Sequence, residues 1–344
     1  MKLPDRFLSP AEAARRLGVS PKALRLYERA GLVEPGRTAA GWRAYGPTEM
    51  ARAAEVAALR ALGLSLAETA RVLAGDCGGL EPALAAHQAQ LEAQAKDLAG
   101  AIAKVRDLRG GLARGEAPGL AELARLRRPA AAPCVAFDLP WPWGGERFEL
   151  CEIEPITFIV GSLGSGKTRL ARRLAEALPA AGFLGPERLE EDETALKARL
   201  AADPESQARV EAALAWLSEE GAERSAALVV LLCAVEDGGS GALVVDMVED
   251  GLGEATQEAL IAWLRRRGPG ARPLFLMTRS SAVLDPSEVG PGEAIILCPA
   301  NHSPPVLVTP RPGAPGFEAL TMCLAPPEVR ARTRGMVAWR PEAA

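Results

Sequence analysis

The sequence predicts an all-α winged helix-turn-helix domain that continues into a coiled-coil helix, followed by an α/β domain built on a largely parallel sheet. Three observations predict this organisation. Short capped helices separated by glycine turns fill the first 75 residues, an apolar heptad pattern runs through residues 84–112, and apolar strands alternate with helices beyond residue 134. We therefore expect four segments, at residues 1–75, 76–114, 115–133 and 134–344.

The composition predicts a cytoplasmic protein with no membrane segment. At 344 residues the chain is long enough for two domains. It contains no apolar run near the roughly 20 residues that span a bilayer, and its first residues lack the apolar core of a signal peptide. The six cysteines form no C-x-x-C pair, which predicts reduced thiols rather than a disulfide framework.

Charge is divided unevenly along the chain. Residues 1–75 hold twelve Lys or Arg against seven Asp or Glu, a net charge of +5, which leaves −9 for the remainder of a chain whose total is −4. A basic head on an acidic body indicates that the head meets a polyanion.

The first domain is expected to begin with two short helices. Ser9, Pro10 and Glu12 form a capping box that starts a helix over residues 9–17, and Gly18 ends it. A second capped helix runs from Ser20 to Arg29, and two helices separated by such a turn are typical of a helix-turn-helix. The Gly- and Pro-rich residues 31–47 predict an extended wing, and further helices are expected at 48–62 and 66–74.

A long helix over about residues 80–112 carries an apolar seam. Its members recur every seven residues, which are Leu84, Leu91, Leu98, Val105 and Leu112. Heptads sustained over this length favour a coiled coil that joins two copies of the chain into a homodimer. The simpler alternative is one amphipathic helix that packs on its own domain.

The α/β domain follows the linker at 115–133. Strands are expected at 156–160, 242–246, 274–278, 294–298 and 306–310, with helices at 167–178 and 254–267. The Pro-rich turns near 304–315 indicate a terminal hairpin.

One motif in this domain carries specific chemistry. Residues 161–168 read G-S-L-G-S-G-K-T, follow an apolar strand and open a helix, so they match the phosphate-binding loop (P-loop) of an α/β P-loop NTPase domain. In such a loop the backbone N–H groups surround phosphate oxygens, the lysine binds the β- and γ-phosphates, and the hydroxyl binds Mg²⁺. The expected nucleotide-binding residues are Gly161, Ser162, Gly164, Ser165, Gly166, Lys167 and Thr168. Asp246, at the end of a second apolar strand, is the expected partner of Thr168 on the metal of Mg-ATP or a related nucleotide.

The order of these motifs resembles the ABC-type ATPases, especially the soluble branch that includes SMC-like proteins. Residues 246–260, DMVEDGLGEATQEAL, align without gaps to that family's DEPTSALDPETQEAL pattern. Residues 220–235 resemble its signature motif and the helix after it, and residues 274–280 resemble its strand ending in T-H-S.

The departures from that pattern affect hydrolysis. The resemblance implies a catalytic Glu where this chain has Met247, a switch His where it has Arg279, and a signature Ser where it has Glu220. A thioether cannot act as a general base, and losing such a base lowers rates by about 10²–10⁴-fold. The nearest carboxylates that could substitute are Glu249 and Asp250. We therefore expect nucleotide binding with slow hydrolysis or none.

The first domain resembles the mercury-resistance regulator (MerR) family over its whole length. The landmarks are LRLYERAGLV at 24–33, WRAYGPTEM at 42–50 and LRALGLSLAETARVL at 59–73. The resemblance implies that the second helix enters the major groove and the wing grips the backbone. The DNA-contacting residues implied by position are Lys22, Arg25, Tyr27, Arg43 and Tyr45. Taken singly, each cation is equally explained by a solvated basic surface, and the spacing on a winged helix-turn-helix is what favours DNA.

Two cysteines offer a different possibility. Cys77 precedes the long helix and Cys134 follows it, so an antiparallel dimer would bring their thiolates together. Metal sites usually need more ligands than this, so an inert thiol is the simpler interpretation.

These observations predict a homodimeric, sequence-specific regulator of transcription that binds double-stranded promoter DNA under the control of a nucleotide. RNA polymerase is a further candidate partner. Three alternatives stay open: a DNA-stimulated ATPase, a thiol or metal sensor with a vestigial P-loop domain, and a scaffold that retains a nucleotide for stability.

Overall fold

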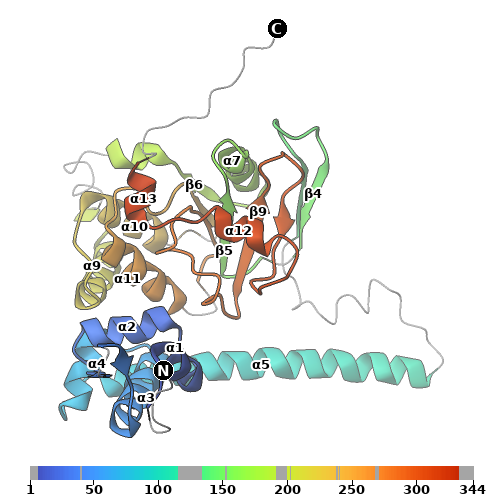
Figure 1. Cartoon of the computed structure of the whole chain (residues 1–344). Coiled ribbons are helices and arrows are strands. Elements are labelled where there is room, and N and C mark those ends of the chain that lie inside the picture. Colours follow the sequence, from blue (N-terminus) through green and yellow to red (C-terminus); the bar gives the residue numbers. More distant parts are fainter. Residues whose placement is uncertain are drawn as a thin grey trace. The chain divides into compact units, whose positions relative to one another are not determined.

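The computed structural model describes residues 7–38, 41–114, 134–151, 153–190, 200–201, 203–237, 239, 241–267 and 271–332. The chain divides into two compact units, Met1–Glu92 and Ala93–Ala344. Figure 1 shows a helical first unit and a second unit built on a sheet. The expected linker at 115–133 lies outside the described residues. Within the described part of the chain, no helix is both long and apolar enough to cross a membrane.

The first unit begins with the expected helix-turn-helix. Helix α1 (Pro10–Leu17) has the Ser9/Glu12 capping box, and α2 (Pro21–Arg29) is capped by Ser20. Gly18 ends α1 in the left-handed conformation that a glycine adopts without steric penalty. Helices α3 (Pro47–Ala61) and α4 (Leu66–Leu73) follow, and all four helices bury apolar residues in one core.

The wing lies between α2 and α3. Its strands, β1 (Gly36–Arg37) and β2 (Arg43–Ala44), pair antiparallel. Leu8 forms an isolated antiparallel bridge with Tyr45 and so anchors the base of the wing to the start of the described chain.

Helix α5 (Leu80–Ala113) is continuous, as the heptad pattern predicts. Its seam residues are between 42% and 63% exposed, namely Leu84, Leu91, Leu98, Val105 and Leu112. A contiguous exposed apolar stripe of this kind is typical of an interaction surface.

The second unit contains a six-stranded sheet in the order β10-β9-β5-β8-β7-β6. The central strands are β5 (Ile156–Gly161), β7 (Leu243–Val245), β8 (Leu274–Met277) and β9 (Glu293–Cys298). Strand β6 (Gly182–Leu184) pairs parallel to β7, and β10 (Val306–Leu307) pairs antiparallel to β9. The parallel sheet and the terminal hairpin at β9–β10 agree with the sequence prediction.

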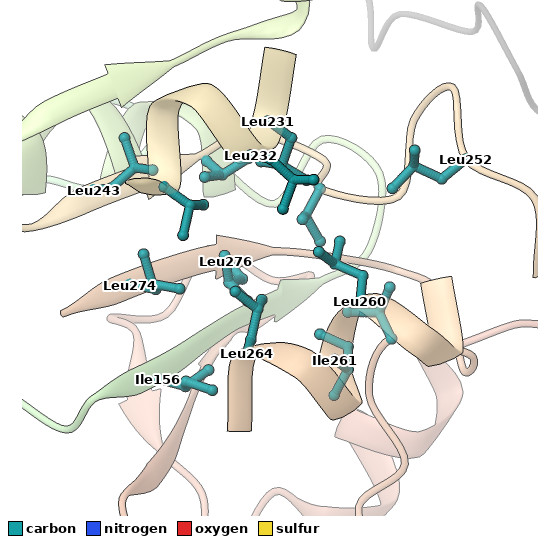
Figure 2. Packing of buried hydrophobic residues seen from close by; sticks show 14 of the residues in the cluster. Ile156, Leu231, Leu232, Leu243, Leu252, Leu260, Ile261, Leu264, Leu274 and Leu276 are labelled. Carbon is teal, nitrogen blue, oxygen red and sulfur yellow. The ribbon is translucent and has the colours of Figure 1, made fainter. Parts of the chain in front are cut away.

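Alternate residues of the central strands face two separate cores. One face of the sheet packs against α7 (Lys167–Ala177), whose Leu170 and Leu174 are fully buried. The other face packs against α9 (Pro204–Glu219), α10 (Ala226–Glu236) and α11 (Glu254–Arg265). Figure 2 shows Leu231, Leu232, Leu260, Ile261 and Leu264 of these helices directed toward the strands. Burial on both faces explains why the strands read as continuous apolar runs.

The structure adds elements that the strand and helix patterns did not predict. A two-stranded hairpin, β3 (Val135–Asp138) with β4 (Arg147–Leu150), precedes the sheet. A 3-10 helix, η2 (Pro186–Glu190), follows β6. The short helices α12 (Phe317–Met322) and α13 (Pro327–Ala331) end the described chain.

The cysteine prediction was wrong at one place. Cys134 and Cys151 form a disulfide, whereas Cys77, Cys233, Cys298 and Cys323 are free thiols. The cause is the hairpin register, because pairing of Val135 with Leu150 places the two cysteines opposite each other on adjacent strands. This register depends on strands that the sequence reading did not recognise.

Candidate nucleic-acid interface and glycine-rich loop

The second helix of the helix-turn-helix presents a polar face to solvent. Leu24 and Tyr27 hold α2 in the core, so Arg25 points away from it and is exposed. Lys22, in the first turn of α2, is half-buried. Because the N-terminal turns of such a helix are the part that enters a groove, Arg25 is well placed to contact DNA.

The wing contributes two arginines and a tryptophan. Arg37 and Arg43 stand on the paired strands and are exposed, and the Arg37 guanidinium donates to the Gly41 carbonyl across the turn at 3.0 Å. Trp42 is 75% exposed, although its backbone is fixed by hydrogen bonds with Thr38. The sequence analysis assigned no role to Trp42. The feature that could have indicated one is an aromatic residue next to Arg43 in a polar hairpin.

The two tyrosines expected to contact the DNA backbone are core residues. Tyr27 is 4% exposed, and Tyr45 has no exposed surface. The Tyr45 hydroxyl donates to the Glu28 carboxylate, which also pairs with the Arg43 guanidinium at 2.8 Å. Both tyrosines pack in the core of the domain, and Glu28 connects α2 to the wing through Arg43 and Tyr45. Their contact with DNA stays a prediction.

In the second unit, the glycine-rich loop joins β5 to α7 as its motif predicts. The Lys167 ammonium folds back and donates to the Ser162 carbonyl at 2.6 Å, which closes the loop. Gly166 has a φ of 93°, and a side chain there would lie 2.6 Å from the Trp143 ring. A side chain at Gly161 would collide with the Cys298 carbonyl and the Ser165 hydroxyl. These contacts explain why small residues are needed at both positions.

Lys167 places a buried positive charge in this loop. It is 7% exposed, and burial lowers its pKa to about 8, with the positive charge of Arg279 acting in the same direction. A buried cation is unfavourable unless an anion compensates it. The carboxylate of Asp246 acts in the opposite direction, and its effect on the pKa is smaller than that of burial or of Arg279.

Asp246 lies beside the hydroxyl of Thr168. The two side chains are hydrogen-bonded, and burial raises the pKa of Asp246. A carboxylate and a hydroxyl at the mouth of a loop of N–H groups are oxygen ligands of the kind that Mg²⁺ prefers. The structure thus brings together Lys167, Thr168 and Asp246.

The backbone after Asp246 is held by an arginine that sequence reasoning missed. Arg188 of η2 is buried and donates to the carbonyls of Asp246 at 2.7 Å and of Met247 at 2.6 Å. Met247 has a φ of 45°, a left-handed conformation that is uncommon outside glycine. Arg188 therefore fixes this turn. In the sequence, the only indication of this role is that Arg188 follows a short strand.

The two carboxylates that might replace the missing base are engaged elsewhere. Glu249 is 2% exposed; one of its oxygens pairs with Arg330 at 2.9 Å and accepts the Arg279 amide at 2.9 Å. Its other oxygen has no hydrogen-bond partner among the described residues, and burial raises the pKa of Glu249. Asp250 is the second partner of Arg330, at 3.3 Å. Arg330 on α13 therefore neutralises both candidates.

Glu220 and the two cysteines that the sequence singled out lie elsewhere in the structure. Glu220 is buried at the end of α9, and Ser225 caps the start of α10. Cys77 is an exposed thiol, while Cys134 is occupied by its disulfide, so the expected thiolate pair does not form within one chain. Within the described residues no group of three or more His, Cys, Asp or Glu side chains could hold a metal ion.

Comparison with known proteins identifies the first domain. The model of the family described as MerR HTH family regulatory protein matches residues 8–76. A probable heavy metal-dependent transcriptional regulator of Haemophilus influenzae is 32% identical over 103 residues, which cover 28% of this chain and 80% of that protein. An uncharacterised HTH-type transcriptional regulator of Synechocystis is 39% identical over 67 residues, covering 19% of this chain and 49% of that protein.

Three solved structures show low similarity to parts of this chain. HiNmlR, a MerR family regulator lacking the sensor domain and bound to promoter DNA, is 21% identical with a TM-score of 0.24, covering 36% of this chain and 97% of that one. A MerR family regulator from Bacillus cereus is 20% identical with a TM-score of 0.25, covering 35% of this chain and 94% of that one. A metal-chelate type ABC transporter in an inward-facing conformation is 15% identical with a TM-score of 0.37, covering 55% of this chain and 86% of that one.

We expect Glu28→Ala to loosen the wing. Removing this carboxylate leaves the buried Tyr45 hydroxyl without its acceptor, which typically costs about 1–3 kcal/mol. Hydrogen exchange of the Tyr45 amide, which donates to the Leu8 carbonyl at 2.9 Å, should accelerate by roughly tenfold or more. Glu55→Ala removes an exposed ion pair with Arg52 and is the matched control, with little change expected. Equal protection in both variants would contradict the role of Glu28.

We expect Arg330→Met to destabilise the second unit in a pH-dependent way. Breaking a buried ion pair usually costs about 3–5 kcal/mol, because Glu249 is left without compensation. The pKa of Glu249 is already raised by burial, so the acid protonates readily. When the pKa of a carboxyl is higher in the folded protein than in the unfolded chain, the free energy of unfolding falls as pH rises through the folded pKa. The loss of stability in Arg330→Met should therefore be larger at pH 8 than at pH 5.

Urea denaturation followed by tryptophan fluorescence at both pH values measures this deficit. Glu249→Gln added to Arg330→Met should recover part of the loss, and exposed Arg332→Met is the control. A deficit that is independent of pH and unchanged in the double variant would show that the ion pair is not its source.

Proposed function

We propose a nucleotide-dependent regulator of transcription, starting from the premise that this chain belongs to the MerR HTH family of regulatory proteins. In this proposal a homodimer binds double-stranded promoter DNA through residues 8–76. Mg-ATP or a related nucleotide, held by residues 161–168, sets the strength of that binding. As a regulator of promoters it would act in the cytoplasm, with RNA polymerase as the further expected partner.

The DNA-binding part is supported by family membership and by the exposed surface of the first unit. Arg25 on α2, with Arg37 and Arg43 on the wing, supplies positive charge on elements that this family model covers. Arg25 is the residue best placed to reach base edges, whereas the wing arginines are suited to phosphate oxygens. A structure of one family member is bound to promoter DNA. Trp42 adds an exposed ring beside the phosphate-contacting residues.

The nucleotide part is carried by one observation, the buried charge of Lys167. The residue is 7% exposed and its pKa is lowered to about 8, and a polyphosphate would supply the missing anion. The helix N-terminus of α7 and the loop N–H groups favour the same ligand. Thr168 and Asp246 would hold the Mg²⁺ that bridges the phosphates, which supplies charge neutralisation when bound.

Slow turnover follows from the surroundings of the site. Met247 offers no base, and Glu249 is held by Arg330 and by the Arg279 amide. The contacts around the loop therefore favour a sensor that distinguishes bound from empty states over a motor. A nucleotide can shift the DNA-bound population only if it binds the two dimer states unequally.

We expect Lys167→Ala to weaken nucleotide binding without unfolding the chain. Calorimetry with Mg-ATP should give a dissociation constant at least tenfold weaker than wild type, because the charge that faces the phosphates is lost. Arg311→Ala, an exposed cation of the same unit, is the control and should bind normally. In the same samples, promoter-DNA affinity should respond to Mg-ATP in wild type and not in Lys167→Ala.

Two other outcomes would refute the sensor. Phosphate release at several turnovers per second, dependent on Lys167, would establish a working ATPase. No heat of binding in wild type would remove nucleotide control altogether and leave a DNA-binding regulator with another effector.

We expect Leu91→Asp together with Leu98→Asp to convert a dimer into a monomer. Both leucines are at least 50% exposed on α5, and a carboxylate in the seam would have to be desolvated between two helices. Sedimentation equilibrium measures the molecular mass. Lys96→Asp introduces a similar charge change away from the seam and should leave the dimer intact. A wild-type chain that sediments as a monomer would contradict the homodimer.

A further inference from the structure

The hairpin β3–β4 forms a closed loop beside the glycine-rich loop. Its strands pair over four residues each, and the disulfide between Cys134 and Cys151 joins the two open ends. The cysteines are separated by 17 positions in the sequence, so the covalent ring encloses both strands and the turn between them. Phe137 and Phe148 pack against each other inside the hairpin, with ring centroids 5.4 Å apart.

The turn of this hairpin is built into the wall of the glycine-rich loop. Trp143 is buried, and its indole N–H donates to the Ser303 carbonyl at 3.0 Å. A side chain at Gly166 would lie 2.6 Å from the Trp143 ring and 2.9 Å from Pro142. Trp141 remains 50% exposed, with the Arg169 guanidinium of α7 4.7 Å from its ring centroid. Movement of this turn would therefore move the residues that contact Gly166.

The segment after β9 contacts the loop from the other direction. The His302 imidazole Nε2 lies 3.2 Å from the Gly164 carbonyl, and the neighbouring Ser303 is the acceptor of Trp143. The hairpin turn, the segment at 299–305 and the glycine-rich loop thus form one hydrogen-bonded unit. Its only covalent constraint among the described residues is the Cys134–Cys151 bond at the far end of the hairpin.

We propose that Cys134 and Cys151 are a reversible thiol–disulfide site that sets the nucleotide affinity of the glycine-rich loop. The inference rests on the proposed function, because it concerns regulation of the same site. In the oxidised form the hairpin ring holds Pro142 and Trp143 against Gly166, and the loop is preorganised for phosphate. In the reduced form the hairpin has more freedom, and part of the binding energy is used to order it.

The chemistry needs one partner of a common class, a low-molecular-weight disulfide or thiol. The Cys134 thiolate attacks one sulfur of an oxidised glutathione-type disulfide, forms a mixed disulfide and expels one thiol. The Cys151 thiolate then attacks the Cys134 sulfur of the mixed disulfide and expels the second thiol. Two protein thiols and one small disulfide thereby become one protein disulfide and two small thiols. Cys134 is exposed and Cys151 is half-buried, so the first attack falls on the accessible member of the pair.

The other cysteines of the second unit are poorly suited to this exchange. Cys233 and Cys298 are buried, and burial raises the pKa of Cys298 to about 12. Burial also raises the pKa of Cys323. Since the thiolate is the reactive form, the raised pKa disfavours exchange at Cys298 and Cys323. Cys233 is buried and therefore shielded from a soluble partner. Cys77 is exposed but belongs to the first unit, which makes it a natural control.

The test uses the full-length chain in oxidised and reduced glutathione buffers. Mg-ATP affinity is measured by calorimetry, and the state of the bond is measured by thiol titration and mass spectrometry. We expect the oxidised protein to bind Mg-ATP about tenfold more tightly than the reduced protein. Cys134→Ser with Cys151→Ser should behave as the reduced protein in both buffers, and Cys77→Ser should respond as wild type. Comparing two redox states of the unmodified chain keeps the test independent of how the variants fold.

The outcomes separate the two proposals. Equal affinities, with thiol titration showing that the bond has opened and closed, would overturn the redox site and leave nucleotide binding intact. A bond that stays oxidised in excess reduced glutathione would also overturn it, since the bond would be a permanent brace. Absence of Mg-ATP binding in every redox state would instead refute the proposed function.

Discussion

The parallel alignment of β5, β7 and β8 is the constraint on which the second unit depends. Pairing of Val245 with Leu276 and of Ile159 with Met277 fixes these strands in register, so their carboxyl ends meet at one edge of the sheet. The glycine-rich loop, Asp246 and Arg279 follow those ends directly. Residues more than 100 positions apart are thereby placed around one buried ammonium, and ligands of α/β folds bind at such an edge.

Neutralisation of charge governs the details of that edge. Arg188 donates to the carbonyls of Asp246 and Met247, and Arg330 pairs with the carboxylates of Glu249 and Asp250. Lys167 is buried, and burial lowers its pKa to about 8. In the proposed function Lys167 attracts the phosphates, whereas Arg330 and the Arg279 amide occupy the acid that hydrolysis would need. Binding without rapid turnover is consistent with both features.

Local patterns predicted the elements well and long-range packing poorly. Capping residues, heptads and the spacing of apolar runs were sufficient for α1 to α5 and for the strand–loop–helix around Lys167, because each depends on neighbours in sequence. The parallel sheet was predicted from the alternation of strands and helices along the chain, although its strands pair across long separations, as Ile156 does with Leu274. The burial of Tyr45, the clamp by Arg188 and the pair of Cys134 with Cys151 depend on partners brought together by folding. Family likeness placed both tyrosines on DNA, and only the packed core assigns them to the interior.

The ion pair between Glu28 and Arg43 of the wing affects how DNA binding should depend on salt concentration. In the free domain the guanidinium of Arg43 already has a carboxylate as its counter-charge at 2.8 Å. In the proposed complex, a phosphate that binds Arg43 replaces the Glu28 carboxylate as its partner. Fewer counterions should then be released than if Arg43 were unpaired in the free domain. The slope of affinity against salt concentration should then understate the number of phosphates touched, since each released counterion contributes to that slope. Because Glu28 neutralises part of the positive charge of the wing in the free domain, this arrangement should weaken nonspecific binding to DNA.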